Sequence, residues 1–369
     1  MPILILRLAV AWASVIAFYL ASGTLLDYGT SLLPAAGVFL WLLVVIMWAA
    51  FGVVHEAEVL AHRLGEPFGT LLLTLSIVII EVALISAVML GAKGSPTLGR
   101  DTMFAVLMIV LNGVVGFGLL LGGLKHFSQR YNLKGASSYL AIIIPLTVIP
   151  LILPNFTTST RDGTLTSFQS ISFSLFTILL YGVFLALQTG RHAHFYQEPP
   201  SDDPSVGVSD AKVEEIIPGG PILTHLILLL LNILPIVFLS KSLAKVLDFG
   251  IARLGAPPAL GGILIAMVVF TPECITALRA ITANQLQRAI NLCLGAAAST
   301  LGLTVPAVLA VGLLTGQNVV MGLSPTNMIL LAMTLLLSTL TFTGTRTTML
   351  EGAVHLGVFF VFLVLVFSP

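Results

Sequence analysis

The chain has 369 residues, of which 57% are hydrophobic and 9% are charged, and its formal net charge is zero. Soluble domains usually carry about 25% charged residues, so this composition excludes an ordinary soluble fold. A neutral chain with so few charges also lacks the basic patch that nucleic-acid binding requires. The two cysteines, Cys274 and Cys293, lie in apolar runs and are interpreted as buried thiols, not as a disulfide or a metal pair.

Eleven apolar runs are long enough to cross a bilayer as helices. About 20 apolar residues span the hydrocarbon core, and a helix satisfies its own backbone hydrogen bonds there. Strands of a membrane β-barrel would be about half as long and would alternate in polarity, unlike these continuous runs. We therefore predict an all-α membrane protein with about eleven transmembrane helices, at 3–22, 34–54, 69–91, 102–122, 137–154, 170–188, 222–240, 258–281, 288–314, 326–344 and 350–367.

The first run could be a cleaved signal peptide, because Arg7 stands near its start. Its reach to Leu20 is long for a signal core, which favours a retained first span. Ten of the sixteen lysine and arginine residues fall in loops on the amino-terminal side of the predicted spans. This bias predicts a cytoplasmic amino terminus in the bacterial inner membrane and, with an odd number of spans, a carboxyl terminus outside.

One long polar segment, 189–219, interrupts the apolar runs and is rich in acidic residues, proline, serine and glycine. We interpret it as a flexible acidic linker on the cytoplasmic side, with a regulatory cation site as the alternative. The predicted organisation has four parts: an extra first helix with its loop at 1–33, a first five-helix repeat at 34–188, the linker, and a second repeat at 220–369.

Two segments of the chain resemble each other. Arg63-Leu64-Gly65-Glu66-Pro67 precedes a run that ends at Glu81, and Arg253-Leu254-Gly255-Ala256-Pro257 precedes a run that ends at Glu273. The two glutamates are 192 residues apart, and the two similar segments open the third and eighth predicted spans. A five-span unit crosses the membrane an odd number of times, so the second repeat must be inverted relative to the first. Inverted repeats with a site near the midplane are a recurring plan of transporters.

Glu81 and Glu273 are the lone acids inside their predicted spans. An ionisable side chain there costs several kcal/mol unless it is paired, hydrated or protonated. A buried carboxyl group readily takes up a proton, so it can hold either a proton or a cation. A protonated glutamate bonded to a neighbouring helix is the structural alternative, but the occurrence of one acid in each repeat favours cation and proton binding.

The residues before each glutamate offer further oxygen atoms. Thr271 and Pro272 precede Glu273, and a proline inside a helix frees a backbone carbonyl one turn earlier, which is a hard ligand for a cation. A packing kink is the other interpretation of this proline. In the first repeat Thr74 lies seven residues before Glu81, and helical geometry favours Thr74 over Ser76 on the face of that glutamate.

The following spans also carry polar residues. Asn112 lies in the middle of one run, and Gln287, Asn291 and Ser299 lie four and eight residues apart along one helical face of another. These side chains are either supporting ligands or interhelical hydrogen-bonding groups.

The segment from His55 to His62, HEAEVLAH, superficially resembles a zinc-protease motif. That motif needs its second histidine four residues after the first, where this chain has Val59. His55 and His62, with Glu58 between them, could form a pH-sensing group or a cation funnel, although histidines at membrane ends need no special role.

At these residues the chain resembles the bacterial calcium (sodium)/proton antiporters of the cation/calcium exchanger superfamily. The strings that carry the resemblance are HRLGEPFGT at 62–70, IIEV at 79–82, Pro272-Glu273, and NQLQRAIN at 284–291. The resemblance implies two inverted five-helix repeats, often an extra first helix, an acidic central loop, and one essential acid per repeat. That role would fall to Glu81 and Glu273.

The chain departs from the wider calcium-exchanger pattern just before the first glutamate. Many members have a small residue and an asparagine there, whereas this chain has Ile79 and Ile80. The missing amide leaves fewer oxygen ligands, which puts calcium selectivity in doubt and keeps sodium or potassium open.

The predicted function is a secondary antiporter that exchanges Ca²⁺, Na⁺ or K⁺ for protons by alternating access, with no cofactor. A monovalent cation/proton antiporter without calcium transport is the main alternative, and a cation channel is a second. An intramembrane enzyme would need a nucleophile–base pair or a metal cluster within the spans, and the sequence shows neither. The expected partners are inorganic cations, protons and the lipid bilayer, and the oligomeric state is left open.

Overall fold

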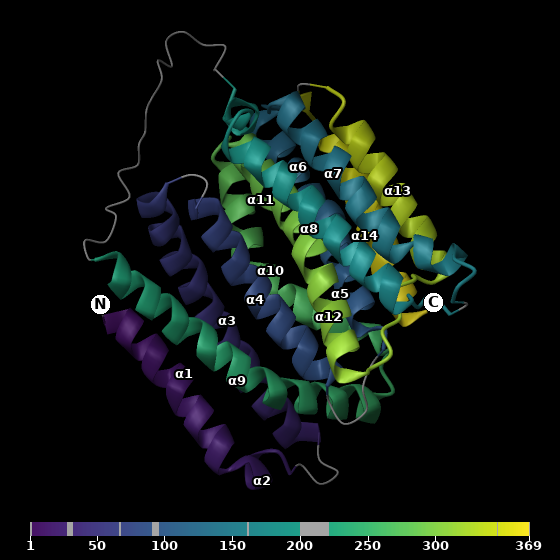
Figure 1. Ribbon diagram of the computed structural model, residues 1–369. Coiled ribbons are helices and arrows are strands. Elements are labelled where there is room, and N and C mark those ends of the chain that lie inside the picture. The colour runs from purple at the N-terminus through teal and green to yellow at the C-terminus, as the bar shows by residue number, and fades with distance from the viewer. Residues whose placement is uncertain are drawn as a thin grey trace.

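The computed structural model describes residues 2–27, 32–65, 68–90, 96–160, 162–199, 221–344 and 346–368. Most of this part of the chain is helical (Figure 1). Ten described stretches are helical, long and apolar enough to cross a membrane, and a shorter apolar helix adds Pro325–Thr341. Each of the eleven predicted spans matches one of these stretches, so the predicted all-α, multi-pass membrane fold is confirmed.

The first half of the molecule contains the extra helix and the first series of spans. Two of its elements matter for the site: the seven-residue π-helix η1, and the four-residue 3₁₀-helix η3 that follows α8. The elements are α1 (Pro2–Leu20), α2 (Ser22–Leu25), α3 (Leu32–Leu64), α4 (Phe68–Met89), α5 (Leu98–Leu107), η1 (Met108–Val114), α6 (Val115–His126), β1 (Gln129–Arg130), α7 (Leu133–Leu151), η2 (Leu153–Phe156), α8 (Ser167–Thr189) and η3 (Ala193–Tyr196).

The second half follows with a matching series. Its elements are α9 (Ile222–Leu254), α10 (Ala259–Thr282), α11 (Leu286–Ser299), the π-helix η4 (Thr300–Thr304), α12 (Val305–Thr315), α13 (Pro325–Thr341), β2 (Arg346–Thr347) and α14 (Met349–Phe367). The strands β1 and β2 pair antiparallel and join the two halves.

The two halves agree in local detail as well as in element order. The first helix of each, α3 and α9, has 33 residues and ends in Arg-Leu-Gly. The two glycines, Gly65 and Gly255, have φ angles of 66° and 62°, a left-handed conformation that glycine adopts without strain after a helix. The last helix of each half, α8 or α14, begins with a threonine capping box, formed by Thr166 with Gln169 and by Thr348 with Glu351.

Two predicted boundaries need correction. The spans at 34–54 and 222–240 were predicted too short, because polar residues follow each apolar run. The helices nevertheless continue to Leu64 and Leu254. At about 1.5 Å per residue a 33-residue helix is roughly 50 Å long, which exceeds the roughly 30 Å hydrocarbon core. The polar residues are therefore the ends of long helices, not separate loops.

The predicted linker at 189–219 lies largely outside the described residues, of which it contains only 189–199.

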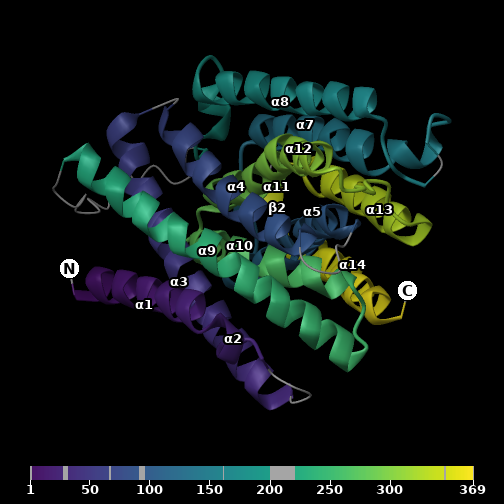
Figure 2. The same cartoon turned by 60° about the horizontal axis from the view of Figure 1, so that its bottom comes forward.

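The helices α1, α3 and α9 lie together along one side of the molecule (Figures 1 and 2). α3 and α9 run antiparallel, since Glu56 near the end of α3 contacts His225 near the start of α9. Both helices pack against α4 and α10, the helices that carry the two predicted site glutamates. The inverted relation that the sequence predicts therefore appears directly in the opposed directions of the first helices of the two halves.

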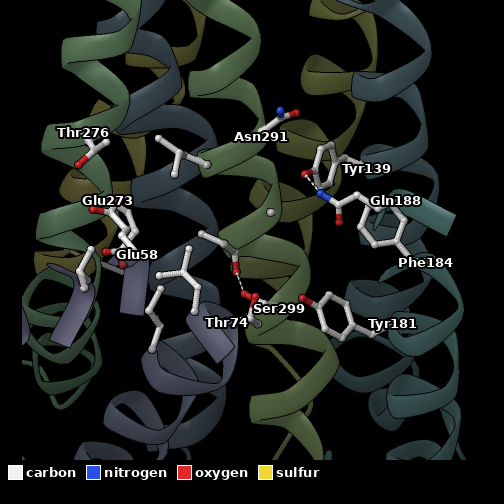
Figure 3. Close-up of a pocket in the computed structure, with 16 residues that line it drawn as sticks. Glu58, Thr74, Tyr139, Tyr181, Phe184, Gln188, Glu273, Thr276, Asn291 and Ser299 are labelled. Atoms are coloured by element: carbon white, nitrogen blue, oxygen red, sulfur yellow. Dashed lines mark hydrogen bonds between the residues drawn. The ribbon is translucent and has the colours of Figure 1, made fainter. Parts of the chain in front are cut away.

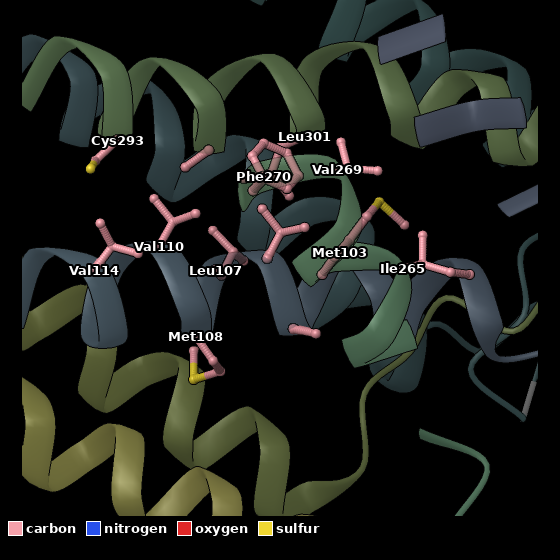
Figure 4. Packing of buried hydrophobic residues seen from close by; sticks show 14 of the residues in the cluster. Met103, Leu107, Met108, Val110, Val114, Ile265, Val269, Phe270, Cys293 and Leu301 are labelled. Atoms are coloured by element: carbon pink, nitrogen blue, oxygen red, sulfur yellow. The ribbon is translucent and has the colours of Figure 1, made fainter. Parts of the chain in front are cut away.

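The centre of the molecule is an apolar contact between α5 with η1, α10, and α11 with η4 (Figure 4). Leu107 from the first half and Leu301 from the second are completely buried there, and Phe270 of α10 is almost completely buried. Tight packing of this kind fixes the helix positions to a fraction of a side-chain diameter. The glutamates of α4 and α10 are held beside this rigid contact.

Close approach of α6 and α14 depends on glycine. A Cβ atom on Gly352 would lie 2.4 Å from the backbone nitrogen of Leu120 and 2.7 Å from the carbonyl oxygen of Gly116. Backbone atoms cannot yield as a flexible side chain does. We predict that Gly352→Ala destabilises the protein by about 1–3 kcal/mol, as overpacking of a tight contact does.

The matched control is Gly357→Ala on the same helix, where an added Cβ meets nothing within 4 Å. This change should be neutral or stabilising by up to about 1 kcal/mol, because alanine favours helix over glycine. Thermal unfolding of both variants in detergent tests the prediction, and an unchanged melting temperature for Gly352→Ala would contradict it.

Candidate functional site

Glu81 lies in the middle of α4 and is fully buried, with 0% of its surface exposed. Its Oε2 atom accepts hydrogen bonds from the hydroxyl groups of Thr300, at 3.1 Å, and Thr304, at 2.9 Å. Its Oε1 atom is buried without a hydrogen-bond partner among the described residues. Hydrogen bonds from neutral donors to a carboxylate stabilise its charged form, so the two hydroxyls offset part of the cost of burying Glu81 as an anion.

Both threonines belong to η4, the π-helical turn between α11 and α12. π-Helical turns are rare and are frequently found at functional sites, because they change the direction in which side chains point. The first half has its own π-helical turn, η1, at the corresponding place between α5 and α6. The 192-residue offset of the two glutamates matches Thr304 with Asn112, which lies in η1.

Glu273 of α10 is also buried, with 8% of its surface exposed, but its surroundings differ. Both of its carboxyl oxygens lack a hydrogen-bond partner within the described part of the chain. Glu58 and Glu81 are close enough to interact with it electrostatically. The two glutamates thus form an asymmetric pair, one bonded to threonine hydroxyls and one with unused oxygen atoms.

Glu273 lines a cavity of about 130 Å³, which is larger than the roughly 30 Å³ that a water molecule occupies in the liquid (Figure 3). The wall is built by α3, α4, α7, α8, α10 and α11. Its polar members are Glu58, Thr74, Tyr139, Tyr181, Gln188, Glu273, Thr276, Asn291 and Ser299.

The cavity lies in the half of the molecule from which the linker leaves. Glu58 is near the end of α3, Thr74 is near the start of α4, and Gln188 is next to the last residue of α8. Glu81 is absent from the cavity lining. Glu273 therefore faces this cavity, while Glu81 is fully buried outside its lining.

The predicted supporting residues divide between the cavity and other contacts. Thr74, Asn291 and Ser299 line the cavity beside Glu273. Thr74 lies beside Ser299 in this wall (Figure 3), and its predicted place on the face of Glu81 stays a prediction. Ser299 donates to the carbonyl of Ala296 at 3.0 Å, a bond within its own helix.

Thr271 and Pro272 stand directly before Glu273 inside the continuous helix α10. The Thr271 hydroxyl donates to the carbonyl of Met267. One turn after Pro272, the Thr276 hydroxyl donates to the Pro272 carbonyl at 3.0 Å and lines the cavity. The hydroxyl groups of this helix are thus bonded to its own backbone.

Asn112 belongs to a buried polar chain that points away from the cavity. Its amide donates to the Thr334 hydroxyl at 2.8 Å, and its Oδ1 atom lies 3.0 Å from Nδ1 of His355. Nε2 of His355 lies 2.9 Å from the hydroxyl of Thr341. The side chain of Asn112 is bonded to residues of α13 and α14. It therefore makes no hydrogen bond to Glu273 like the one that Thr304 donates to Glu81.

Gln287 and Asn291 connect α11 to the segment that follows α8. The Gln287 amide donates to Oδ1 of Asn291 at 2.8 Å, and the Asn291 amide donates to the carbonyl of Tyr196 at 2.7 Å. Oε1 of Gln287 accepts the backbone N–H of Asn132 at 2.6 Å. These two residues therefore make the interhelical hydrogen bonds that were the alternative interpretation, and only Asn291 also lines the cavity.

The start of the linker is fixed to the same helix. The backbone N–H groups of Gln287 and Arg288, at the start of α11, donate to the carboxyl group of Glu198. Burial raises the pKa of Glu198, and these two hydrogen bonds partly offset that rise by stabilising the anion. One of the linker's acidic residues thus serves as a cap for a cavity-forming helix.

Sequence reasoning missed the two threonines that bond Glu81. Thr300 and Thr304 are four residues apart in an apolar run, a spacing that places two hydroxyls on one helical face. This spacing can be seen in the sequence, but it does not show which glutamate the two hydroxyl groups contact. Glu58 was noticed only as part of HEAEVLAH, whereas the structure places it in the wall of the Glu273 cavity.

His55 and His62, the histidines of that motif, are both exposed. Within the described ranges, no group of three or more histidine, cysteine or acidic side chains could hold a metal ion.

Comparison with known proteins identifies relatives that match most of the chain. A protein described as the putative ionic transporter y4hA of Sinorhizobium fredii (strain NBRC 101917 / NGR234) is 42% identical over 87% of this chain and 86% of its own length. The sodium-potassium/proton antiporter ChaA of Escherichia coli (strain K12) is 38% identical over 88% of this chain and 87% of its own.

The fold is also found among solved structures. The structure of native YfkE covers 98% of this chain and 100% of its own, with a TM-score of 0.72 and 17% identity, a likeness in fold alone. The sequence model of the family described as sodium/calcium exchanger protein matches residues 34–190 and 224–368, which leaves out α1 and most of the linker. With both halves matched and relatives this similar, the chain belongs to the sodium/calcium exchanger family.

Proposed function

We propose that this protein is a secondary antiporter that exchanges a metal cation for protons across the cell membrane, with Glu81 and Glu273 as the shared binding groups. The observation that carries the proposal is the buried pair of corresponding glutamates in α4 and α10, in a chain of this family. A carboxyl group buried at this depth must be neutralised by a proton or by a cation. Competition between the two for the same groups is what links their movements.

The asymmetry of the pair supports alternating access. Glu273 faces a cavity in the linker half of the molecule, and Glu81 is sealed behind the hydroxyls of Thr300 and Thr304. We infer that this conformation loads or releases ions on the linker side, which the distribution of lysine and arginine places in the cytoplasm. A channel would need a path open to both sides at once, and proton-coupled flux distinguishes the two.

The side-chain oxygens around Glu81 are fewer than Ca²⁺ usually takes, which favours a monovalent cation of low coordination number such as Na⁺. Ca²⁺ takes six to eight oxygen ligands. Glu81 is met by two threonine hydroxyls, and Ile79 and Ile80 before it contribute no side-chain oxygen. The relative at 38% identity bears the name sodium-potassium/proton antiporter, in agreement with this preference. Cation-dependent proton flux in everted vesicles, measured with Na⁺, K⁺ and Ca²⁺ in turn, tests both the exchange and the preference.

We also propose that the chain is organised as an extra first helix at 1–33, repeats at 34–188 and 220–369, and the linker at 189–219 between them. The family match begins at residue 34 and resumes at 224, which supports these boundaries. Each repeat contributes one glutamate and one π-helical turn to the centre of the molecule.

Replacement of either glutamate by glutamine should abolish exchange. Glutamine keeps the shape of the side chain but cannot titrate or carry charge. Glu81→Gln and Glu273→Gln should therefore reduce cation-dependent proton flux to the level of vesicles without the protein, while the protein still inserts into the membrane. The control is Asp162→Asn in an exposed loop, which should retain normal flux. Normal coupled flux in either glutamine variant would falsify the assignment.

Removal of the hydroxyls around Glu81 should weaken cation binding. Hydrogen bonds to charged groups contribute about 1.5–3 kcal/mol, and 1.4 kcal/mol corresponds to a factor of ten. Thr300→Val and Thr304→Val should each raise the apparent KM for the cation about tenfold. Thr315→Val at the end of α12 is the matched control, because its hydroxyl bonds only to the carbonyl of Val311. Equal KM values in the three variants would show that the hydroxyls do not support the site.

The shared site also predicts the effect of pH. Protons on the cation side should occupy the glutamates and exclude the cation, so acidification of that side should raise the apparent KM. The maximal rate at saturating cation should be much less affected by this competition. Initial uptake into proteoliposomes, with the two pH values varied separately, measures both quantities. A KM indifferent to pH on the cation side would require separate paths for cation and proton.

A further inference from the structure

A second group of ionisable side chains is buried outside the glutamate site. It consists of Arg7 on α1, Glu56 on α3, and His225 with Asn232 on α9. Nδ1 of His225 lies 2.7 Å from Oε2 of Glu56, a close contact between two groups that are each less than a tenth exposed. Buried ionisable residues in membrane proteins are costly, and they usually have a function.

Gly52 creates the space for the cationic member of this group. A Cβ atom at Gly52 would lie 2.5 Å from Nε of Arg7 and 2.3 Å from Oδ1 of Asn232. The donor and the acceptor are therefore within about 5 Å of each other. Both atoms are buried without a hydrogen-bond partner in the described ranges. A small side-chain rotation would let Nε of Arg7 donate a hydrogen bond to Oδ1 of Asn232. The group therefore has a second possible hydrogen-bonding arrangement.

The charges of the group balance in only one of the two protonation states of histidine. With His225 neutral, the positive Arg7 is offset by the negative Glu56. A proton on His225 adds one positive charge and converts its contact with Glu56 into an ion pair. Histidine is the side chain whose charge most readily changes between about pH 5 and 8, and His225 is the histidine of this group.

The charged and titratable residues of the surrounding helices are few. The exposed His55 and His62, Glu58 in the cavity wall, and Arg63 about two turns beyond Glu56 complete the set near this end of α3. α4 contributes only Glu81, and α10 contributes Glu273, Cys274 and Arg279. Arg7 and Glu56 therefore provide the fixed charges around His225.

The group lies near the end of the molecule from which the linker leaves. His225 is three residues after the start of α9, and Glu56 is eight residues before the end of α3. α3 and α9 both pack against α4 and α10, so a change between the first two helices reaches the helices that carry the proposed site.

We propose that Glu56 and His225 form a second proton-binding centre, separate from the transport site, through which the pH on the linker side controls the rate of exchange. Protonation of His225 strengthens its bond to Glu56 and holds α3 against α9 in the present arrangement. Loss of the proton leaves a weaker neutral hydrogen bond, which allows the two helices to move. The proposal uses the proposed exchange activity as its readout.

The test separates this centre from competition at the transport site, because competition changes KM and the new centre changes the maximal rate. We would measure both in proteoliposomes at saturating cation while the linker-side pH is varied from about 6 to 8. The wild-type maximal rate should fall about five- to tenfold on acidification, the lower range of effects between linked sites. In His225→Asn, which retains an N–H donor for Glu56 but cannot titrate, the maximal rate should be independent of linker-side pH.

His55→Asn is the matched control, since this exposed histidine lies next to Glu56 in the sequence and outside the cluster, and its profile should equal that of the wild type. In Glu56→Gln the maximal rate should also become independent of linker-side pH. This variant replaces His225→Asn in the test if His225→Asn does not insert into the membrane. A wild-type maximal rate that ignores linker-side pH, or variants that keep the wild-type profile, would overturn the proposal. If the maximal rate depends on linker-side pH but the KM for the cation does not, the result would instead count against the shared binding of cation and proton at Glu81 and Glu273.

Discussion

The cost of burying a carboxyl group is the constraint on which the centre of this molecule depends. Glu81 meets part of that cost with two threonine hydroxyls, both carried by the π-helical turn η4. A regular helix would keep the same residues but direct them differently. The rigid apolar contact of α5, α10 and α11 then fixes the distance between η4 and α4. Local helix geometry, tight packing and the burial of one carboxyl group are thus parts of a single arrangement.

The two halves share a plan but do not surround their glutamates in the same way. Asn112 occupies the position that corresponds to Thr304, yet α13 and α14 engage it through Thr334 and His355. Glu273 is left with two unused oxygen atoms and a cavity. A molecule with two identical half-sites would bind equally from both directions. If the two glutamates bind the ions as proposed, their unequal surroundings would give them different affinities in one conformation, a difference that a transporter needs at each stage of its cycle.

Much of the fold was predictable because the bilayer restricts the alternatives so strongly. Apolar runs of about 20 residues have one solution in lipid, and all eleven predicted spans correspond to described helices. The Arg-Leu-Gly segments predicted matching helix ends, and Gly65 and Gly255 have the same left-handed conformation. The lengths of α3 and α9 were not predictable from hydropathy, because a helix that leaves the membrane continues through polar residues without an apolar signal.

The site was less predictable because its contacts join residues more than 200 positions apart. Periodicity shows which side chains share a helical face, but it does not show which helix that face meets. Thr300 and Thr304, which bond Glu81, were therefore overlooked. The same limit hid the contact between Glu56 and His225, which are 169 residues apart. In a chain with so few charges, each ionisable residue inside a span is expected to have a polar or charged partner on another helix. Only the packing of the helices identifies that partner.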